Sequence, residues 1–343
     1  MSAPAVTRRD ADAEIRSTVR IPLSVAPMMA RTDRHFRYLL RQITRRSLLY
    51  SEMVHARAVV RGRRERLLAF DAAEHPLVLQ IGSDDPADAA AAARVAEAWG
   101  YDEVNLNVGC PSDRVQAARF GACLMAEPER VARIVDAMAD AVSIPVSVKH
   151  RIGIDDLDRY EDLLGFVDRV AASGACARFT VHARKAWLSG LSPRENRTIP
   201  PLRYDLVHRL KRDRPDLTIE INGGIQSLAE AREQLERVDA VMIGRAVYDR
   251  PMMLAGADRD LFGAADERQP SSREVLLAML PYVERERLAG TRLQEISRHM
   301  MGLFAGEPGA GAWRRRRSAG QHRPDAGPEL LLAAAPSASP TES

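Results

Sequence analysis

Short apolar runs rich in β-branched residues recur along this chain, and each is followed by a stretch with helical periodicity. Eight runs are expected to be strands: Leu23–Met28, Leu48–Val54, Leu77–Ile81, Glu103–Val108, Pro145–Lys149, Arg178–His182, Thr218–Asn222 and Ala240–Gly244. Helices are expected between them, among others at Pro86–Trp99, Pro128–Ala141, Leu157–Ala172 and Leu228–Leu235. Strands that alternate with helices pair in parallel, because parallel neighbours need crossover connections. Eight units over roughly 240 residues are typical of an α/β fold of the (β/α)₈ TIM-barrel type.

An open doubly wound sheet is the alternative fold, and it is disfavoured because no GxGxxG motif opens the first βα turn. The domain boundaries follow from composition. We expect a flexible N-terminus over 1–20, a catalytic barrel over 21–263 and a small helical domain over 264–317. Within that domain, Arg273–Arg287 and Leu293–Phe304 have helical spacing. The stretch 318–343 is rich in Pro, Ala, Gly and Ser, which predicts a disordered tail.

Composition and charge limit the possible binding partners of the protein and its cellular compartment. Net charge is only +3, but the cations are mostly arginine, whose planar fork suits phosphate groups. Three cysteines without CxxC or Cys/His spacing argue against a disulfide framework and against a metal site. The segment 1–20 is polar, unlike a signal peptide, and no apolar run reaches the ~20 residues of a membrane span. We therefore expect a cytoplasmic monomer with no membrane contact.

The most informative motif is Asn105–Pro111, where a buried strand ends in a Gly-Cys-Pro turn. Gly109 permits a sharp turn, and Pro111 stops the strand from continuing. Cys110 is thereby directed beyond the carboxyl end of its strand, which is where barrels carry their active sites. The motif alone leaves open whether Cys110 is a nucleophile or a proton donor.

Two glycine-containing turns follow the last two expected strands, namely Asn222-Gly223-Gly224 and Gly244-Arg245. Barrels commonly bind phosphate with the loops after strands seven and eight. Glycine lets backbone N–H groups approach phosphate oxygens, and an arginine adds a bidentate charge. Together the two turns predict a phosphate site.

Polar residues also end several other strands. They are Gln80, Asn107, Lys149 and His182, and the first strand ends in Pro27, Met28 and Met29. Amides can contact the polar edge of a planar ring, and thioethers can pack on its face. A phosphorylated planar cofactor fits this set. Flavin mononucleotide (FMN) suits it best, with Lys149 beside N1 of the reduced ring. Pyridoxal phosphate, with Lys149 as its Schiff base, is the alternative, but it would leave Cys110 without a role.

Seven segments resemble the tRNA-dihydrouridine synthase family, A subfamily. They are APMMARTDRHFR (26–37), NLNVGCPSDRVQAARFGACLMAEP (105–128), VKHRIGID (148–155), HARKAWLSGLSPRENRTIPPL (182–202), INGGIQS (221–227), IGRAVYDRP (243–251) and ISRHMMGLFAGEPGA (296–310). The resemblance covers residues 21 to about 315. It departs at Ala30-Arg31, where members usually carry bulky residues, and we expect only a local effect. The stretch after Arg317 does not resemble the usual ending.

The resemblance implies a flavin barrel followed by a helical tRNA-binding domain. It implies FMN contacts from Pro27, Met28, Met29, Gln80, Lys149, His182, Asn222, Gly223, Gly224, Gly244 and Arg245. It further implies NADPH as reductant, uridines 20 and 20a of the D-loop as targets, and Cys110 as the proton donor. A free thiol is mostly protonated at neutral pH, which suits an acid.

The target uridine is stacked in folded RNA and must be extruded to reach a flavin inside a barrel. Rim cations would hold the backbone. The expected tRNA contacts are Asn107, Arg184, Arg194, Arg197 and Arg298. Two other functions remain open from the sequence: a flavin barrel that reduces a free pyrimidine or enone, and a tRNA-binding protein without redox chemistry.

Overall fold

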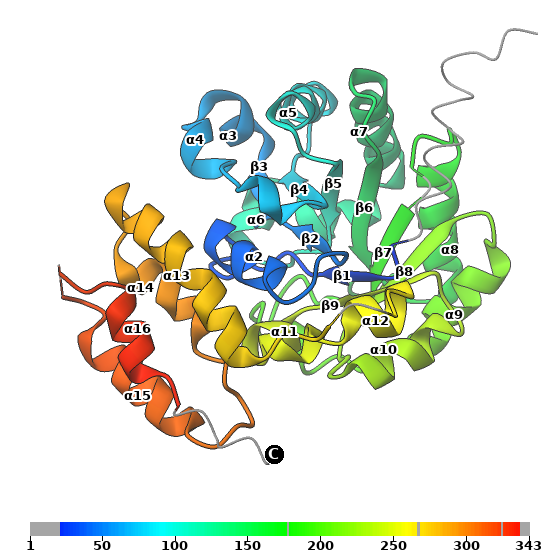
Figure 1. Cartoon of the computed structure of the whole chain (residues 1–343). Helices are drawn as coiled ribbons and strands as arrows, with labels where there is room; N and C mark the ends of the chain where they lie inside the picture. Colours follow the sequence, from blue (N-terminus) through cyan, green and yellow to red (C-terminus); the bar gives the residue numbers. More distant parts are fainter. Residues whose placement is uncertain (1–20, 177, 266–267, 324, 337–343) are drawn as a thin grey trace, which may run out of the picture.

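The computed structural model describes residues 21–176, 178–265, 268–323 and 325–336 (Figure 1). The predicted flexible segment 1–20 and the end of the predicted tail, 337–343, lie outside these residues. The strands are β1 Leu23–Val25, β2 Leu48–Tyr50, β3 Val54–His55, β4 Leu77–Gly82, β5 Glu103–Val108, β6 Val146–Arg151, β7 Arg178–His182, β8 Thr218–Asn222 and β9 Ala240–Ile243. All pairs are parallel, and β1 pairs with both β9 and β2. Because β2 also pairs with β4, the sheet closes into the predicted (β/α)₈ barrel.

Three strands end two or more residues away from their predicted ends, and the other bounds differ by at most one residue. β1 ends at Val25, because Pro27 cannot donate a ladder hydrogen bond. The run expected at Leu48–Val54 divides into β2 and the short β3, which pairs only with the end of β4 among the described strands. β6 continues through Arg151, two residues beyond its expected end, since β7 pairs with it over its whole length. Each difference lies at the carboxyl ends, where the loops of the site begin.

Helices cover the outside of the barrel. They are α2 Arg34–Arg41, α3 Ala56–Arg61, α4 Arg64–Leu67, α5 Pro86–Trp99, α6 Asp113–Ala117, α7 Pro128–Ala141, α8 Tyr160–Ala171, α9 Tyr204–Asp213, α10 Leu228–Leu235, α11 Arg245–Asp249 and α12 Ala257–Phe262. The predicted bounds of α5, α7 and α10 coincide with the observed ones. Both α5 and α7 begin with proline in the first turn, which is a strong start signal.

Alternating polarity along the strands separates the two faces of the barrel wall. In β5, Val104, Leu106 and Val108 belong to the apolar core, while Asn105 and Asn107 make side-chain hydrogen bonds within the barrel. Successive strand residues point to opposite faces, so this pattern places the amides inside. The barrel interior is therefore unusually polar.

Deep in the barrel, a buried ion cluster fills the interior. Arg178 Nη2 lies 3.3 Å from Glu220 Oε1, and Arg178 Nη1 lies 4.0 Å from Glu103 Oε2. The hydroxyls of Ser24 and Thr180 also donate to Glu220, at 2.6 and 2.5 Å. Buried charges persist only when paired and hydrogen-bonded in this way.

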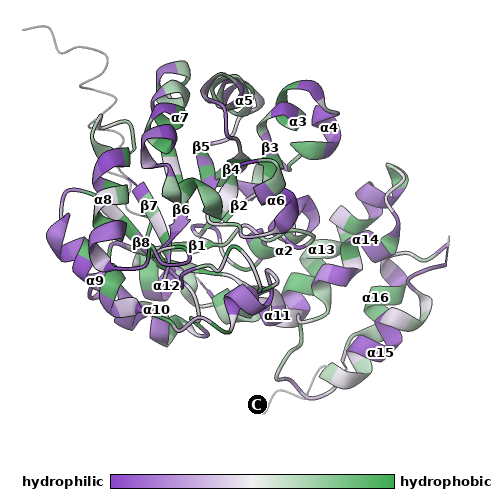
Figure 2. Ribbon diagram, turned by 180° about the vertical axis from the view of Figure 1, so that it is seen from behind, coloured by the Kyte–Doolittle hydropathy of each residue, from purple (hydrophilic) through white to green (hydrophobic). Residues whose placement is uncertain are grey.

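A second group of helices packs to one side of the barrel (Figure 1): α13 Ser272–Leu288, α14 Leu293–Ser297, α15 Ala310–Gly320 and α16 Pro328–Ala334. The disorder predicted for 318–343 is wrong where the structure describes it, because α15 extends to Gly320 and α16 follows. Leu331 of α16 is fully buried, and Figure 2 shows how apolar this helix is beside α15. Composition alone missed it because a short apolar run folds only when neighbouring helices cover it.

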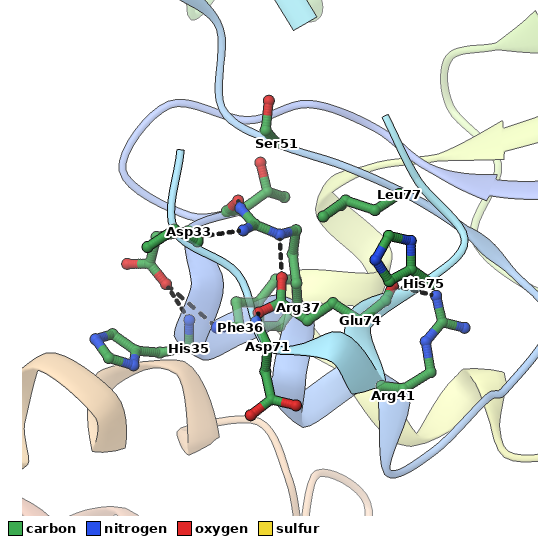
Figure 3. Close-up of polar contacts among 12 residues, drawn as sticks. Asp33, His35, Phe36, Arg37, Arg41, Ser51, Asp71, Glu74, His75 and Leu77 are labelled. Carbon is green, nitrogen blue, oxygen red and sulfur yellow. Dashed lines mark hydrogen bonds and ion pairs between the residues drawn. The ribbon is translucent and has the colours of Figure 1, made fainter. Parts of the chain in front are cut away.

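The loop between β1 and α2 is held by a buried ion pair (Figure 3). Arg37 Nε donates to Glu74 Oε2 at 2.6 Å, and both side chains are almost fully buried. Arg37 also donates to the carbonyl of Thr32 at 2.8 Å. In turn, the Thr32 hydroxyl accepts the N–H of Met28 at 2.9 Å. The ion pair thus fixes a loop whose residues reach the functional site.

Candidate functional site

A cavity of about 350 Å³ opens at the carboxyl ends of the barrel strands. The sequence-predicted residues that line it are Pro27, Met28, Met29, Gln80, Asn107, Cys110, Lys149, His182, Arg197, Asn222, Gly223, Gly224, Gly244 and Arg245. These residues come from seven separate βα segments and meet at one place, as barrel geometry requires. The structure does not bring Arg184, Arg194 or Arg298 into this lining.

Cys110 lies in a loop that is tied down on several sides. The carboxamide oxygen of Asn107 accepts the backbone N–H groups of Gly109 and Cys110, at 3.2 and 3.0 Å. Arg151 Nε donates to the carbonyl of Gly109 at 2.8 Å, and the N–H of Ala122 donates to the carbonyl of Cys110 at 2.9 Å. The thiol is partly exposed and free. A rigid backbone with an accessible thiol suits a group that must meet one atom of a ligand.

The two predicted amides contact one another as well as the cavity. Gln80 Nε2 donates to Asn105 Oδ1, and Asn107 Nδ2 donates to Gln80 Oε1, both at 2.8 Å. Because Asn105 also donates to Ser147 at 2.8 Å, these groups form one buried chain. Asn107 therefore positions the Cys110 loop, a role that the sequence did not predict. Its contact with tRNA stays a prediction.

Lys149, two residues before the end of β6, and His182, the last residue of β7, both line the cavity. Lys149 Nζ donates to Asn222 Oδ1 at 3.0 Å. Burial, together with the nearby Arg151, lowers the pKa of Lys149 to about 8. Burial and the surrounding cations lower the pKa of His182 well below its ordinary range, so its imidazole is neutral at pH 7. An anion beside these groups would favour the protonated form of both.

The Asn222-Gly223-Gly224 turn requires its glycines. Gly223 and Gly224 have φ values of +117° and +77°, a region that side chains rarely adopt. A Cβ on Gly223 would lie 2.8 Å from the ring of His182, and a Cβ on Gly224 would lie 2.5 Å from Leu202. The backbone consequently comes close to the cavity without side chains in between.

Sequence reasoning missed several lining residues, among them Arg31, Met53 and Arg151. Arg151 is buried and joins the loop after β5 to the loop after β7, because it donates to the carbonyls of Gly109, Lys185 and Asn196. Its position two residues after Lys149, on the same face of β6, was the available signal.

The three arginines outside the lining have other contacts. Arg298 pairs with Asp33 at 2.5 Å, so it joins the helical domain to the loop after β1. Arg184 donates to the carbonyl of Pro200. Arg194 is exposed beside the 3₁₀ turn Glu195–Arg197. All three lie at the surface or at the domain boundary, so their contact with tRNA remains a prediction.

Neither a metal site nor a membrane-spanning helix is found in the described part of the chain. Within the described ranges, no group of three or more His, Cys, Asp and Glu side chains could hold a metal ion. None of the helices in the described part of the chain is long and apolar enough to cross a membrane.

The chain is similar in sequence to dihydrouridine synthases. The family model of dihydrouridine synthase matches residues 24–339. The chain belongs to the dihydrouridine synthase family. As a member of it the chain is an enzyme, and the resemblance seen in the sequence is confirmed.

Several characterised relatives of this dihydrouridine synthase carry the name tRNA-dihydrouridine(20/20a) synthase. The protein of Synechocystis sp. is 58% identical over 91% of this chain and 93% of its own length. The protein of Escherichia coli strain K12 is 55% identical over 90% and 89%. The protein of Vibrio cholerae is 53% identical over 90% and 94%. Similarity extends over both the barrel and the helical domain.

A solved structure resembles the barrel. The complex of 2-naphthoyl-CoA reductase with 2-naphthoyl-CoA superposes with a TM-score of 0.50 at 12% sequence identity. The match covers 68% of this chain and spans about half, 49%, of that one. At this identity the likeness concerns the fold alone.

Proposed function

We propose that this dihydrouridine synthase reduces uridine to 5,6-dihydrouridine in the D-loop of tRNA, at positions 20 and 20a, with FMN as cofactor and NADPH as reductant. The observation that carries the proposal is the cavity at the barrel mouth. It combines a rigidly held thiol, a glycine cradle and several cations in one space. The names of the relatives support the substrate and the positions.

The residues present fit FMN. Gly223 and Gly224 present close backbone beside Arg245, which suits a phosphate group. Met28 and Gln80 offer a thioether and an amide to a planar ring. The Lys149 ammonium would face the negative charge of the reduced flavin. Among the described residues that line the cavity none is acidic, which suits an anionic cofactor.

The chemistry divides between cofactor and protein. When bound, reduced FMN supplies a hydride to C6 of the uracil ring. The electron pair of the C5–C6 double bond then needs a proton at C5, and Cys110 Sγ gives up its hydrogen there as general acid. The thiolate is reprotonated from solvent, to which Cys110 is partly open. A reducing cytoplasm goes with this proposal, because Cys110 must remain a free thiol.

The test is to incubate the purified holoenzyme with NADPH and unmodified tRNA, and to map dihydrouridine by mass spectrometry. We expect the modification at positions 20 and 20a. Free uridine serves as the second substrate in parallel. Turnover of free uridine at the tRNA rate would instead support the reductase of a small pyrimidine, and absence of bound flavin would support an RNA-binding protein without redox chemistry.

Gly224→Ala is expected to abolish FMN retention. The new Cβ would collide with Leu202 and would force a positive φ on alanine. Flavin absorbance per protein, measured after gel filtration, checks this. Gly290→Ala is the matched control, because Gly290 also has a positive φ, +93°, but has open space around it and lies in the helical domain. Equal flavin loss in both variants would refute a specific role for Gly224.

FMN affinity should depend on pH through Lys149. Because its pKa is lowered to about 8, the free protein carries a neutral amine above that pH. The negative charge of bound reduced FMN favours the ammonium and raises its pKa, so the affinity for reduced FMN is greatest below pH 8. It should fall by up to about tenfold per pH unit above pH 8. Anaerobic absorbance titrations of the apoprotein with reduced FMN between pH 7 and about 9.5 measure this. Lys149→Met should bind more weakly and lose this dependence, and an unchanged profile would contradict the assignment.

A further inference from the structure

Arg31 is a cation of the cavity that neither the cofactor site nor the proton donor uses. It lies in the loop between β1 and α2 and lines the cavity. Its guanidinium carbon lies 4.5 Å from the centroid of the Tyr248 ring, a cation–π geometry. Among the described residues, its Nη1 is buried and has no hydrogen-bond partner. A buried donor without an acceptor calls for an explanation, and on a cavity lining an acceptor brought by a ligand supplies one.

The acids around Arg31 are absent or already engaged. The described lining of the cavity contains no carboxylate. Asp33, two residues away, caps α2 by accepting the N–H groups of His35 and Phe36 at 3.0 and 3.2 Å. The other oxygen of Asp33 contacts His299 Nε2 at 2.9 Å. Glu52 accepts the N–H of Ala30, next to Arg31, but forms no ion pair with Arg31 among the described residues. The charge of Arg31 is thus left for an anion from outside.

Arg197 faces the same space. Arg197, Arg245 and Arg31 line the same cavity, and the pKa of Arg197 is lowered, first by burial and then by the charges of Arg245 and Arg31. An anion between Arg31 and Arg197 would relieve this repulsion. Of these three arginines, Arg245 is the one beside the glycine turn, and this turn suits the FMN phosphate.

Arg31 also lies at the boundary between the two domains. Its stacking partner, Tyr248, has its hydroxyl 3.3 Å from His299 Nδ1, and His299 comes from the helical domain. An RNA strand that contacts both the barrel mouth and the helical domain would pass close to Arg31.

We propose that Arg31 binds a backbone phosphodiester of the RNA strand, next to the nucleotide that enters the cavity, as a second phosphate site separate from that of FMN. This inference rests on the proposed function. Arg31 donates two N–H groups of its planar fork to the phosphate, while the Tyr248 ring holds the fork in place.

The experiment compares Arg31→Met, Arg31→Gln and Arg31→Lys in the FMN-loaded full chain. The dissociation constant for unmodified tRNA is measured over a series of KCl concentrations. Both neutral variants should bind roughly tenfold more weakly at low salt. The slope of log Kd against log salt should fall by about 0.7 to 0.9, the loss of one phosphate contact. Arg31→Lys should retain most of the slope.

Arg212→Met is the matched control. Arg212 is an exposed arginine near the end of α9, close in the chain to the start of β8 and so at the opposite end of the barrel from the cavity. This variant should bind tRNA like the unmodified protein. Melting temperature and flavin content should be unchanged in all variants, and Arg31→Gln keeps the test valid if Arg31→Met unfolds.

Three outcomes would overturn the inference. Unchanged tRNA affinity and salt slope in both neutral variants would exclude a phosphate contact. Loss of FMN with normal tRNA binding would assign Arg31 to the cofactor phosphate. A raised KM for NADPH with normal tRNA binding would assign it to the dinucleotide. If the unmodified enzyme forms no dihydrouridine, the proposed function itself fails, which is a separate result from any of these.

Discussion

Cys110→Ala is expected to lower dihydrouridine formation by about 10²- to 10⁴-fold while flavin reduction by NADPH continues at its normal rate. Flavin reduction needs no proton at C5 of uracil, whereas product formation does. The Asn107 and Arg151 contacts to the Cys110 loop use backbone atoms, so they survive the substitution. Stopped-flow bleaching of the flavin and mass spectrometry of tRNA measure the two steps separately.

Cys123→Ala is the control for this result. Cys123 is a partly buried cysteine in the same loop region, but it is not among the residues lining the cavity. Its thiol contacts the carbonyl of Phe120 at 3.2 Å, and burial raises its pKa. This variant should keep full turnover. Normal turnover by Cys110→Ala, or equal loss in both variants, would end the assignment of Cys110 as the acid.

Arg37→Met should destabilise the fold by about 3–5 kcal/mol, because it leaves the fully buried Glu74 carboxylate without its cation. The Thr32 carbonyl loses a donor in the same step, so the Met28 loop loosens and flavin retention should fall as well. Urea unfolding of the apoprotein gives the change in the free energy of unfolding. Absorbance of the holoenzyme gives the flavin content.

The double variant Arg37→Met/Glu74→Leu tests the cause. It removes both charges and replaces them with apolar groups of similar size, so it should be more stable than Arg37→Met alone. Arg57→Met is the matched control. Arg57 also pairs with an acid, Asp88, but at the surface, where such a pair contributes at most about 1 kcal/mol. A loss below 1 kcal/mol in Arg37→Met would show that the buried pair does not hold this loop.

The strands show which features of the fold the sequence pattern predicts and which it does not. Alternation of Val104, Leu106 and Val108 with Asn105 and Asn107 predicts a strand, and the structure has it at Glu103–Val108. Pattern reading did not reveal that the two amides form one chain with Gln80. Hydrogen bonds between strands depend on register, and register is set by pairing across the whole barrel.

The stretch after Arg317 is a case in which composition predicted the wrong structure. Pro, Ala, Gly and Ser predicted disorder after Arg317, yet α16 packs Leu331 into the core of the helical domain. Arg317 belongs to a run of four arginines, Arg314–Arg317. It is buried, because it donates to the carbonyl of Ser297 at 2.8 Å. Neither fact has a local signal, since both depend on distant helices that supply the contacts.

The sequence alone predicted the barrel, its alternating elements, the cysteine turn and the glycine turns. These depend on local periodicity and on residues with few allowed backbone conformations, so neighbours along the chain suffice. Only the tertiary structure decided which cations share a space, that Arg298 pairs with Asp33, and that Arg31 keeps an unpartnered donor at the cavity. Charge interactions act through space between segments far apart in sequence, and the folded chain is what places them within reach of one another.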